Sequence, residues 1–145
     1  TCSDRERARY VEKISGPLLD RIDLHITVPS VEYEAMRRRE KPESSKDVKA
    51  RVDAARAVQT ARLSGSGAAC NAQIAPSQLA EFCRLDDAGE KLMKNAFQRM
   101  GLTARSHDRI LRVARTIADL EGEPDIGAAH LAEAIQYRNT DILKG

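Results

Sequence analysis

The segment between residues 103 and 120 carries arginines at helical spacing, and arginine is the residue type in this chain best suited to bind a phosphate group. A guanidinium keeps its charge at every physiological pH, and its planar fork can grip two oxygens at once. On a helical wheel these side chains lie opposite an apolar arc that runs from Ile110 to Leu120. The arginines are Arg105, Arg109, Arg112 and Arg115. They predict an exposed cationic face.

Arg105 is the least compensated arginine of this face. Asp108 can pair with Arg112 one turn later, and Arg115 can pair in the same way with Asp119. Arg105 sits instead in the first turn, where the helix dipole disfavours a cation. Either a phosphate ligand explains its position, or Arg105 is one unfavourably placed cation on an exposed polar face.

No motif of a self-contained active site is present. The sequence lacks a GxxxxGK(S/T) phosphate-binding loop, an HExxH pair, a GxSxG nucleophile and a GxGxxG dinucleotide loop. The histidines and cysteines are scattered and lack ligand spacing, so we expect no metal site and no disulfide framework. They are His25, His107, His130, Cys2, Cys70 and Cys83.

The composition is typical of packed helices. Among 145 residues, 41% are hydrophobic but only 3% are aromatic, so the core must be built from Leu, Ile, Val and Ala. The net charge of +2 lacks the basic excess expected where nucleic-acid phosphates dominate binding. No apolar run approaches the roughly 20 residues that cross a bilayer, and unpaired cysteines suit a reducing compartment. We therefore expect a cytoplasmic protein without a membrane partner.

The hydrophobic periodicity predicts helices around one strand. A helix is expected over 4–14, then a strand over 23–28, a polar loop over 30–43 and a long helix over 44–63. The strand follows from the alternation of Leu24, Ile26 and Val28. Because one strand is not stable alone, its sheet would have to include sequence outside this chain.

Four further helices joined by short loops are expected from residue 75 onward. Pro76 opens the first, Asp87 caps the second, Thr103 caps the third and Asp125 caps the fourth. Gly122 ends the third helix. The expected fold class is therefore mainly α, with a small helical bundle at the C-terminal end.

Two stretches of the sequence resemble one family. Residues 13–26, Lys-Ile-Ser-Gly-Pro-Leu-Leu-Asp-Arg-Ile-Asp-Leu-His-Ile, are similar to the segment of magnesium-chelatase-like AAA+ ATPases that carries the arginine finger and leads into the last core strand. Residues 102–120 resemble the sensor-2 helix in the lid of the same family. The helix start at 43–45 and the ending at 133–138 also fit, so the resemblance covers nearly the whole chain in order.

The resemblance implies roles for three arginines. Arg21 matches the arginine finger, which reaches the ATP of a neighbouring subunit and stabilises the departing phosphoryl group. Without the resemblance, a surface pair of Arg21 with Asp20 or Asp23 stays open as the alternative. Arg105 matches sensor 2, which contacts the ATP phosphates, and Arg109 is the second choice for that role.

The resemblance also implies three segments. Residues 1–28 would be a remnant of the AAA+ core with the finger and the last strand, 29–74 a loop and connecting helix, and 75–145 a four-helix sensor-2 lid. The longer parent protein would hydrolyse ATP with Mg²⁺ as a homo-oligomeric, hexameric ring. ComM-type members of the family are associated with DNA translocation and branch migration, which implies a DNA-remodelling motor.

This chain by itself is expected to bind no cofactor and to hydrolyse no ATP. It lacks the phosphate loop with its lysine and the magnesium-binding acid. Two interpretations without an ATPase role stay open. One is a helical nucleic-acid-binding module whose 105–115 helix enters a groove, and the other is a protein-interaction domain.

Overall fold

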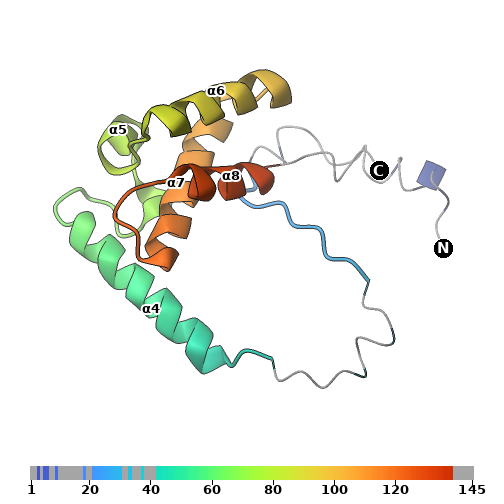
Figure 1. The fold of residues 1–145 in the computed structure, drawn as a ribbon, viewed down its shortest axis with the longest axis horizontal. Coiled ribbons are helices and arrows are strands. Elements are labelled where there is room, and N and C mark those ends of the chain that lie inside the picture. The colour runs from blue at the N-terminus through green and yellow to red at the C-terminus, as the bar shows by residue number, and fades with distance from the viewer. Residues whose placement is uncertain are drawn as a thin grey trace.

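The computed structural model describes residues 21–30 and 42–138, together with residues 3, 5, 6, 9, 18, 33 and 37. Within this part the chain forms helices and no strand, which confirms a mainly helical fold (Figure 1). The elements in chain order are α4 (Ser45–Arg62), η1 (Asn71–Gln73), η2 (Pro76–Gln78), α5 (Leu79–Phe82), α6 (Asp87–Met100), α7 (Ala104–Glu121) and α8 (Ala128–Gln136). Most of the helix expected over 4–14 and of the loop over 30–43 lies outside the described residues.

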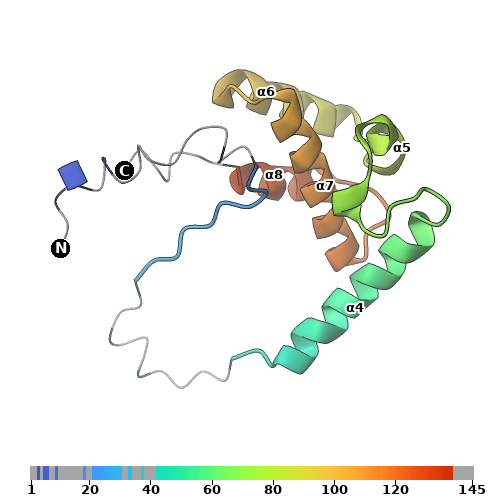
Figure 2. The same cartoon turned by 180° about the vertical axis from the view of Figure 1, so that it is seen from behind.

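Helix α7 is the centre of the bundle. Helices α4, α5 and α8 and the turn η1 all pack against it (Figures 1 and 2). Thr103 caps its start as predicted, because the Thr103 hydroxyl accepts a hydrogen bond from Ser106 N at 3.2 Å. Gly122 follows its end with a φ of 77°, which glycine adopts without strain. Ile110 and Ala118 of α7 are completely buried.

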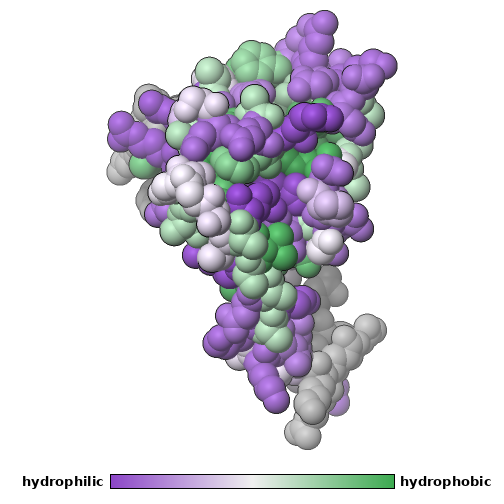
Figure 3. All heavy atoms as spheres, turned by 90° about the vertical axis from the view of Figure 1, so that its left-hand side faces the viewer, coloured by the Kyte–Doolittle hydropathy of each residue, from purple (hydrophilic) through white to green (hydrophobic). Residues whose placement is uncertain are grey.

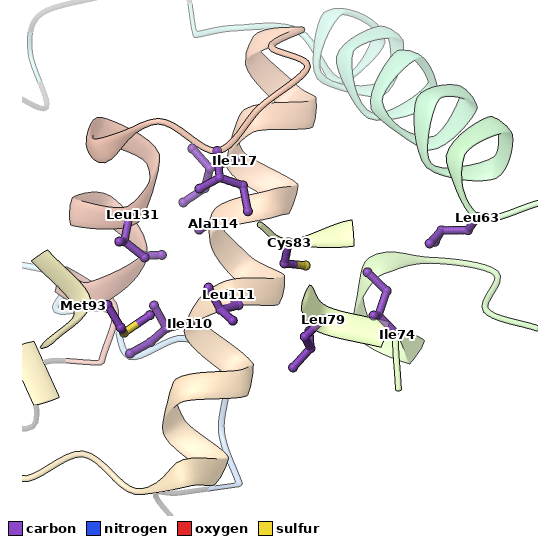
Figure 4. Close-up of a cluster of buried hydrophobic side chains, with 12 residues drawn as sticks. Leu63, Ile74, Leu79, Cys83, Met93, Ile110, Leu111, Ala114, Ile117 and Leu131 are labelled. Atoms are coloured by element: carbon purple, nitrogen blue, oxygen red, sulfur yellow. The ribbon is translucent and has the colours of Figure 1, made fainter. Parts of the chain in front are cut away.

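One hydrophobic core joins these helices (Figure 4). Its buried members are Leu63, Ile74, Leu79, Cys83, Met93, Ile110, Leu111, Ala114, Ile117, Ile126, Leu131 and Ala134. Burying one large aliphatic side chain contributes about 1.5–3 kcal/mol relative to leaving it exposed. Since Leu63 and Ile74 belong to this core, the C-terminal end of α4 is fixed to the bundle.

Two helices begin at other residues than expected. Asp86, not Asp87, caps α6 by accepting a main-chain hydrogen bond at 2.7 Å. Helix α8 begins three residues after Asp125 rather than next to it. The reason is that Ile126 is buried and forms an isolated parallel bridge with Leu85, so this residue is extended and cannot start a helix.

Helix α4 reaches beyond the bundle at its N-terminal end (Figure 1). Ser44, the first residue of the helix predicted over 44–63, caps it by accepting a hydrogen bond from Asp47 N at 3.2 Å. Ala55 is buried, whereas Val48 and Val52 are 40% and 45% exposed because the first turns project away from the other helices. In the space-filling view hydrophobic residues and hydrophilic residues lie side by side on the part of the molecule that extends below the bundle (Figure 3).

The strand predicted over 23–28 is wrong for this chain. Residues 21–30 form an open, non-helical segment without strand pairing (Figure 1). Leu24, Ile26 and Val28 are 45%, 65% and 83% exposed, so no described part of the chain covers the alternating apolar side. A strand needs a hydrogen-bonded neighbour, and the described residues supply none.

Candidate functional site

Arg109 ties the segment that contains Arg21 to helix α7. Its Nη1 donates hydrogen bonds to the Arg21 main-chain oxygen, at 2.6 Å, and to Asp23 Oδ1, with which it also forms an ion pair. The Asp23 side chain is 55% exposed, so the ion pair alone contributes little. Asp23 therefore pairs with Arg109 rather than with Arg21, and the Arg21 side chain is exposed.

Arg138 holds the same segment from the end of α8, and the sequence analysis did not identify it as a site residue. It is only 5% exposed. Its Nη1 donates to the Ile22 main-chain oxygen and its Nη2 donates to Ser106 Oγ at 3.0 Å. The neighbouring Tyr137 accepts a main-chain hydrogen bond from His25 N at 2.8 Å. In the sequence Arg138 stands only as a cation after an apolar helix, within the 133–138 ending that resembles the family, and neither signal indicates that it is buried.

Arg105 lies exposed in the first turn of α7. No acidic residue accompanies it in that turn. Among the described residues, nothing forms an ion pair with its guanidinium. Arg105 directly precedes Ser106, the residue that Arg138 binds. The structure thus joins the main chain of Arg21 to Arg109, while Arg105 is exposed and has no ion pair with any described residue.

A small cavity lies between this segment and α7. Its volume is about 140 Å³, and it is lined by Asp23, Ala72, Arg109, Arg112, Val113 and Thr116. Small-molecule sites typically begin at roughly 300 Å³, so a nucleotide does not fit inside it. Both of its arginines already have partners, since Arg112 Nε donates to the Ile74 main-chain oxygen at 2.9 Å.

The exposed cationic face predicted for α7 is wrong at Arg115. This residue is 3% exposed, and it lies 3.0 Å from Asp119 in the predicted ion pair, which is buried. Its other hydrogen bonds go to the main-chain oxygens of Glu123 and Pro124, at 2.7 and 2.8 Å. The burial follows from the loop after α7, which folds back over the guanidinium.

The predicted pair between Asp108 and Arg112 is also wrong. Asp108 Oδ1 lies 3.2 Å from His107 Nδ1, while Arg112 is turned toward η1 and binds Ile74. Helix α7 therefore does not present a row of free cations. This arrangement disfavours insertion of α7 into a nucleic-acid groove, which needs several unpaired cations on one face.

Asp119 is the centre of a buried polar network near the C-terminal end of α7. Arg62 binds both of its carboxylate oxygens, at 2.7 and 2.6 Å, and Asn71 Nδ2 donates to Oδ2 at 2.8 Å. Burial alone would raise the pKa of Asp119, but hydrogen bonds from Arg62 and Asn71 and the charge of Arg115 hold this pKa below its ordinary value. The network fixes α4 and η1 against α7.

His130 and Cys83 have structural surroundings. In the described part of the chain, no group of three or more His, Cys, Asp or Glu residues is arranged to hold a metal ion. His130 Nδ1 accepts a hydrogen bond from Gly127 N at 2.9 Å at the start of α8. Burial raises the pKa of the Cys83 thiol to about 11.

None of the described helices is long and apolar enough to span a bilayer.

Two family models match the chain. The model of magnesium chelatase, subunit ChlI C-terminal, matches residues 42–138, and the model of magnesium chelatase, subunit ChlI, matches residues 1–36. The competence protein ComM of Haemophilus influenzae is 36% identical over 137 residues, which cover 94% of this chain and 26% of ComM. The uncharacterized protein YifB of Escherichia coli is 36% identical over 143 residues, which cover 98% of this chain and 28% of YifB.

The chain thus spans little more than a quarter of the length of these relatives. Its fold agrees with the matches, because the helices α4 to α8 lie within the residues that match the C-terminal model. That model covers well over half of the sequence. The chain therefore belongs to the magnesium chelatase ChlI family.

Proposed function

We propose that this chain is the arginine-finger and sensor-2 region of an AAA+ ATPase that works as a homo-oligomeric, hexameric ring. The family implies ATP and Mg²⁺ in the parent protein, and the length of the relatives supports a longer protein around this segment. The observation that carries the proposal concerns Arg21. Its main chain is tied to α7, while its side chain is exposed.

An arginine finger needs a fixed base and a free guanidinium. Here Arg109 and Arg138 bind the main-chain oxygens of Arg21 and Ile22, two consecutive residues. ATP bound to a neighbouring subunit would supply the phosphoryl group. The Arg21 guanidinium would reach across the subunit boundary and stabilise the charge that develops on this group. Such fingers contribute about 10³–10⁵-fold to hydrolysis in the systems where they are known.

Arg105 is the better candidate for sensor 2, and Arg109 the weaker one. Arg109 already pairs with Asp23 and would have to leave this partner to bind a phosphate. Arg105 is exposed in the first turn of α7, where main-chain N–H groups and the helix dipole favour an anion. A phosphate next to Arg105 would compensate a cation that the helix itself disfavours.

The residues present fit phosphate contacts and not a complete nucleotide site. The exposed guanidiniums of Arg21 and Arg105 suit phosphate oxygens, but the sequence has no phosphate-cradling glycine loop with its lysine. The remaining site, including the ligands of Mg²⁺, would come from the rest of the parent protein. From the similarity to ComM we further infer that the parent moves or remodels DNA.

Steady-state ATP turnover of the full-length protein tests the proposal. Arg21→Ala should lower kcat by about 10³-fold or more while size-exclusion chromatography shows intact ring assembly. Arg105→Ala should raise the KM for ATP. Arg84→Ala, which removes an exposed arginine elsewhere on the bundle, is the matched control and should leave turnover unchanged. Unchanged turnover in Arg21→Ala would show that Arg21 is only a surface cation.

A further inference from the structure

Arg138 is a buried arginine that helps to fix the base of the proposed finger and also binds a second part of the chain. A guanidinium is costly to bury unless its donors have partners. In this chain the two terminal nitrogens of Arg138 donate to different parts of the molecule. Nη1 binds the main-chain oxygen of Ile22, and Nη2 binds Ser106 Oγ at 3.0 Å.

The two acceptors are adjacent to the two proposed functional arginines. Ile22 follows Arg21, and Ser106 follows Arg105 in the first turn of α7. One planar guanidinium therefore bridges the segment that carries the finger and the turn that carries the sensor. The bridge is reinforced beside it, because His25 N donates to the main chain of the residue before Arg138 at 2.8 Å.

We propose that Arg138 is a positioning residue that makes the Arg21 segment and the start of α7 move as one unit. The proposal rests on the proposed function of Arg21. When an anionic phosphate draws Arg105 and the first turn of α7 toward it, the bridge carries the main chain of Arg21 along. Nucleotide binding at Arg105 is thereby coupled to the position of Arg21, the finger that contacts another subunit.

The fork of arginine is required for this role. Lysine at position 138 would keep the charge, but a single ammonium on a flexible stem lacks the fixed, divergent donors that span the Ile22 oxygen and Ser106 Oγ. Arg138→Lys should therefore loosen Arg21 without removing a cation. A misplacement of about 1 Å in a catalytic group costs up to about 10²-fold in rate.

The experiment is a double-mutant cycle in the full-length protein, with ATP turnover as the measurement. Arg138→Lys alone should lower kcat by about 10–10²-fold with little change in KM. In the Arg21→Ala background the same substitution should have no further effect, because there is no finger left to misplace. Arg84→Gln and Arg84→Lys, at an exposed position, are the matched controls and should be neutral in both backgrounds.

The results separate the two proposals. If Arg21→Ala leaves kcat unchanged, the proposed function of Arg21 fails, and the coupling role fails with it. If Arg21→Ala lowers kcat but Arg138→Lys is neutral, or acts equally in both backgrounds, then Arg138 is only structural and the finger stands. Should Arg138→Lys not assemble into rings, Ser106→Ala decides, since it removes one acceptor and should lower kcat only while Arg21 is present.

Discussion

Replacing Asp119 by Asn should destabilise the helical bundle more than any conservative change on its surface. Asp119 is 4% exposed, and its two carboxylate oxygens accept hydrogen bonds from Arg62, Asn71 and Arg115. Asn keeps the shape of the Asp side chain, but it replaces one carboxylate oxygen, a hydrogen-bond acceptor, by an NH₂ group. This NH₂ group would face the N–H donors that now bind the carboxylate. It also leaves two guanidiniums without a counter-charge. Breaking a buried ion pair in this way costs about 3–5 kcal/mol.

Thermal unfolding of the chain, followed by far-UV circular dichroism, measures this loss. A change of 1 kcal/mol shifts the Tm of a small domain by about 4–8 °C, so Asp119→Asn should lower it by roughly 12–40 °C. The matched control is Asp53→Asn on α4. The Asp53 side chain is 60% exposed and pairs with Lys49, so its loss should cost no more than about 1 kcal/mol. Equal Tm values for the two variants would refute the stabilising role of the network.

The Tm difference between the unchanged chain and Asp119→Asn should depend on pH, and it should become smaller in acid. The pKa of Asp119 is lowered in the folded chain, so its ionised form stabilises the fold above the ordinary value of about 3.9. That stabilisation is lost as the pH falls through the lowered pKa. The Tm gap between the unchanged chain and Asp119→Asn should therefore be constant near neutral pH and narrow below about pH 4. A gap that persists in strong acid would contradict this assignment.

Two further predictions concern the core. Leu131→Ala removes a side chain with no exposed surface and should cost about 2–5 kcal/mol in a denaturant titration; Leu120→Ala, at a site that is 46% exposed, should cost far less, and similar values would mean that the core is packed differently. Because burial raises the pKa of Cys83 to about 11, its thiol should resist iodoacetamide in the folded chain at near-neutral pH and react in urea. Cys70, which is only partly buried, is the internal control in mass spectrometry, and faster labelling of Cys83 would contradict its burial.

Local signals predicted the helices well. Ser44 and Thr103 each offer a side-chain oxygen to the main chain of the next turn, and Gly122 ends α7, so these three boundaries depend on neighbours within a few residues. Where a distant contact intervened, the prediction failed. The start of α8 moved because Ile126 is held by Leu85, which lies far away in the sequence.

The strand prediction failed for a related reason. The apolar residues at 24, 26 and 28 alternate as the side chains of a strand do. A strand also requires main-chain hydrogen bonds to another segment. In the described part of the chain the segment instead bonds to α7 and to the end of α8, through Arg109, Arg138 and the main chain of His25. The pattern could not reveal these contacts, because their partners lie far away in the sequence.

The sequence by itself determined the family, the helical class and the arginines that are candidates for phosphate contacts, because these depend on residue types and short spacings. Only the tertiary structure showed that those arginines have different surroundings. Arg115 is buried with Asp119, Arg109 is tied to Asp23, and Arg105 remains exposed. The difference is physical: a helical wheel fixes which residues share a face, but the charge and burial of that face depend on segments that pack against it from elsewhere in the chain. Arg138 and Ile22, which are 116 residues apart, meet only in the folded molecule.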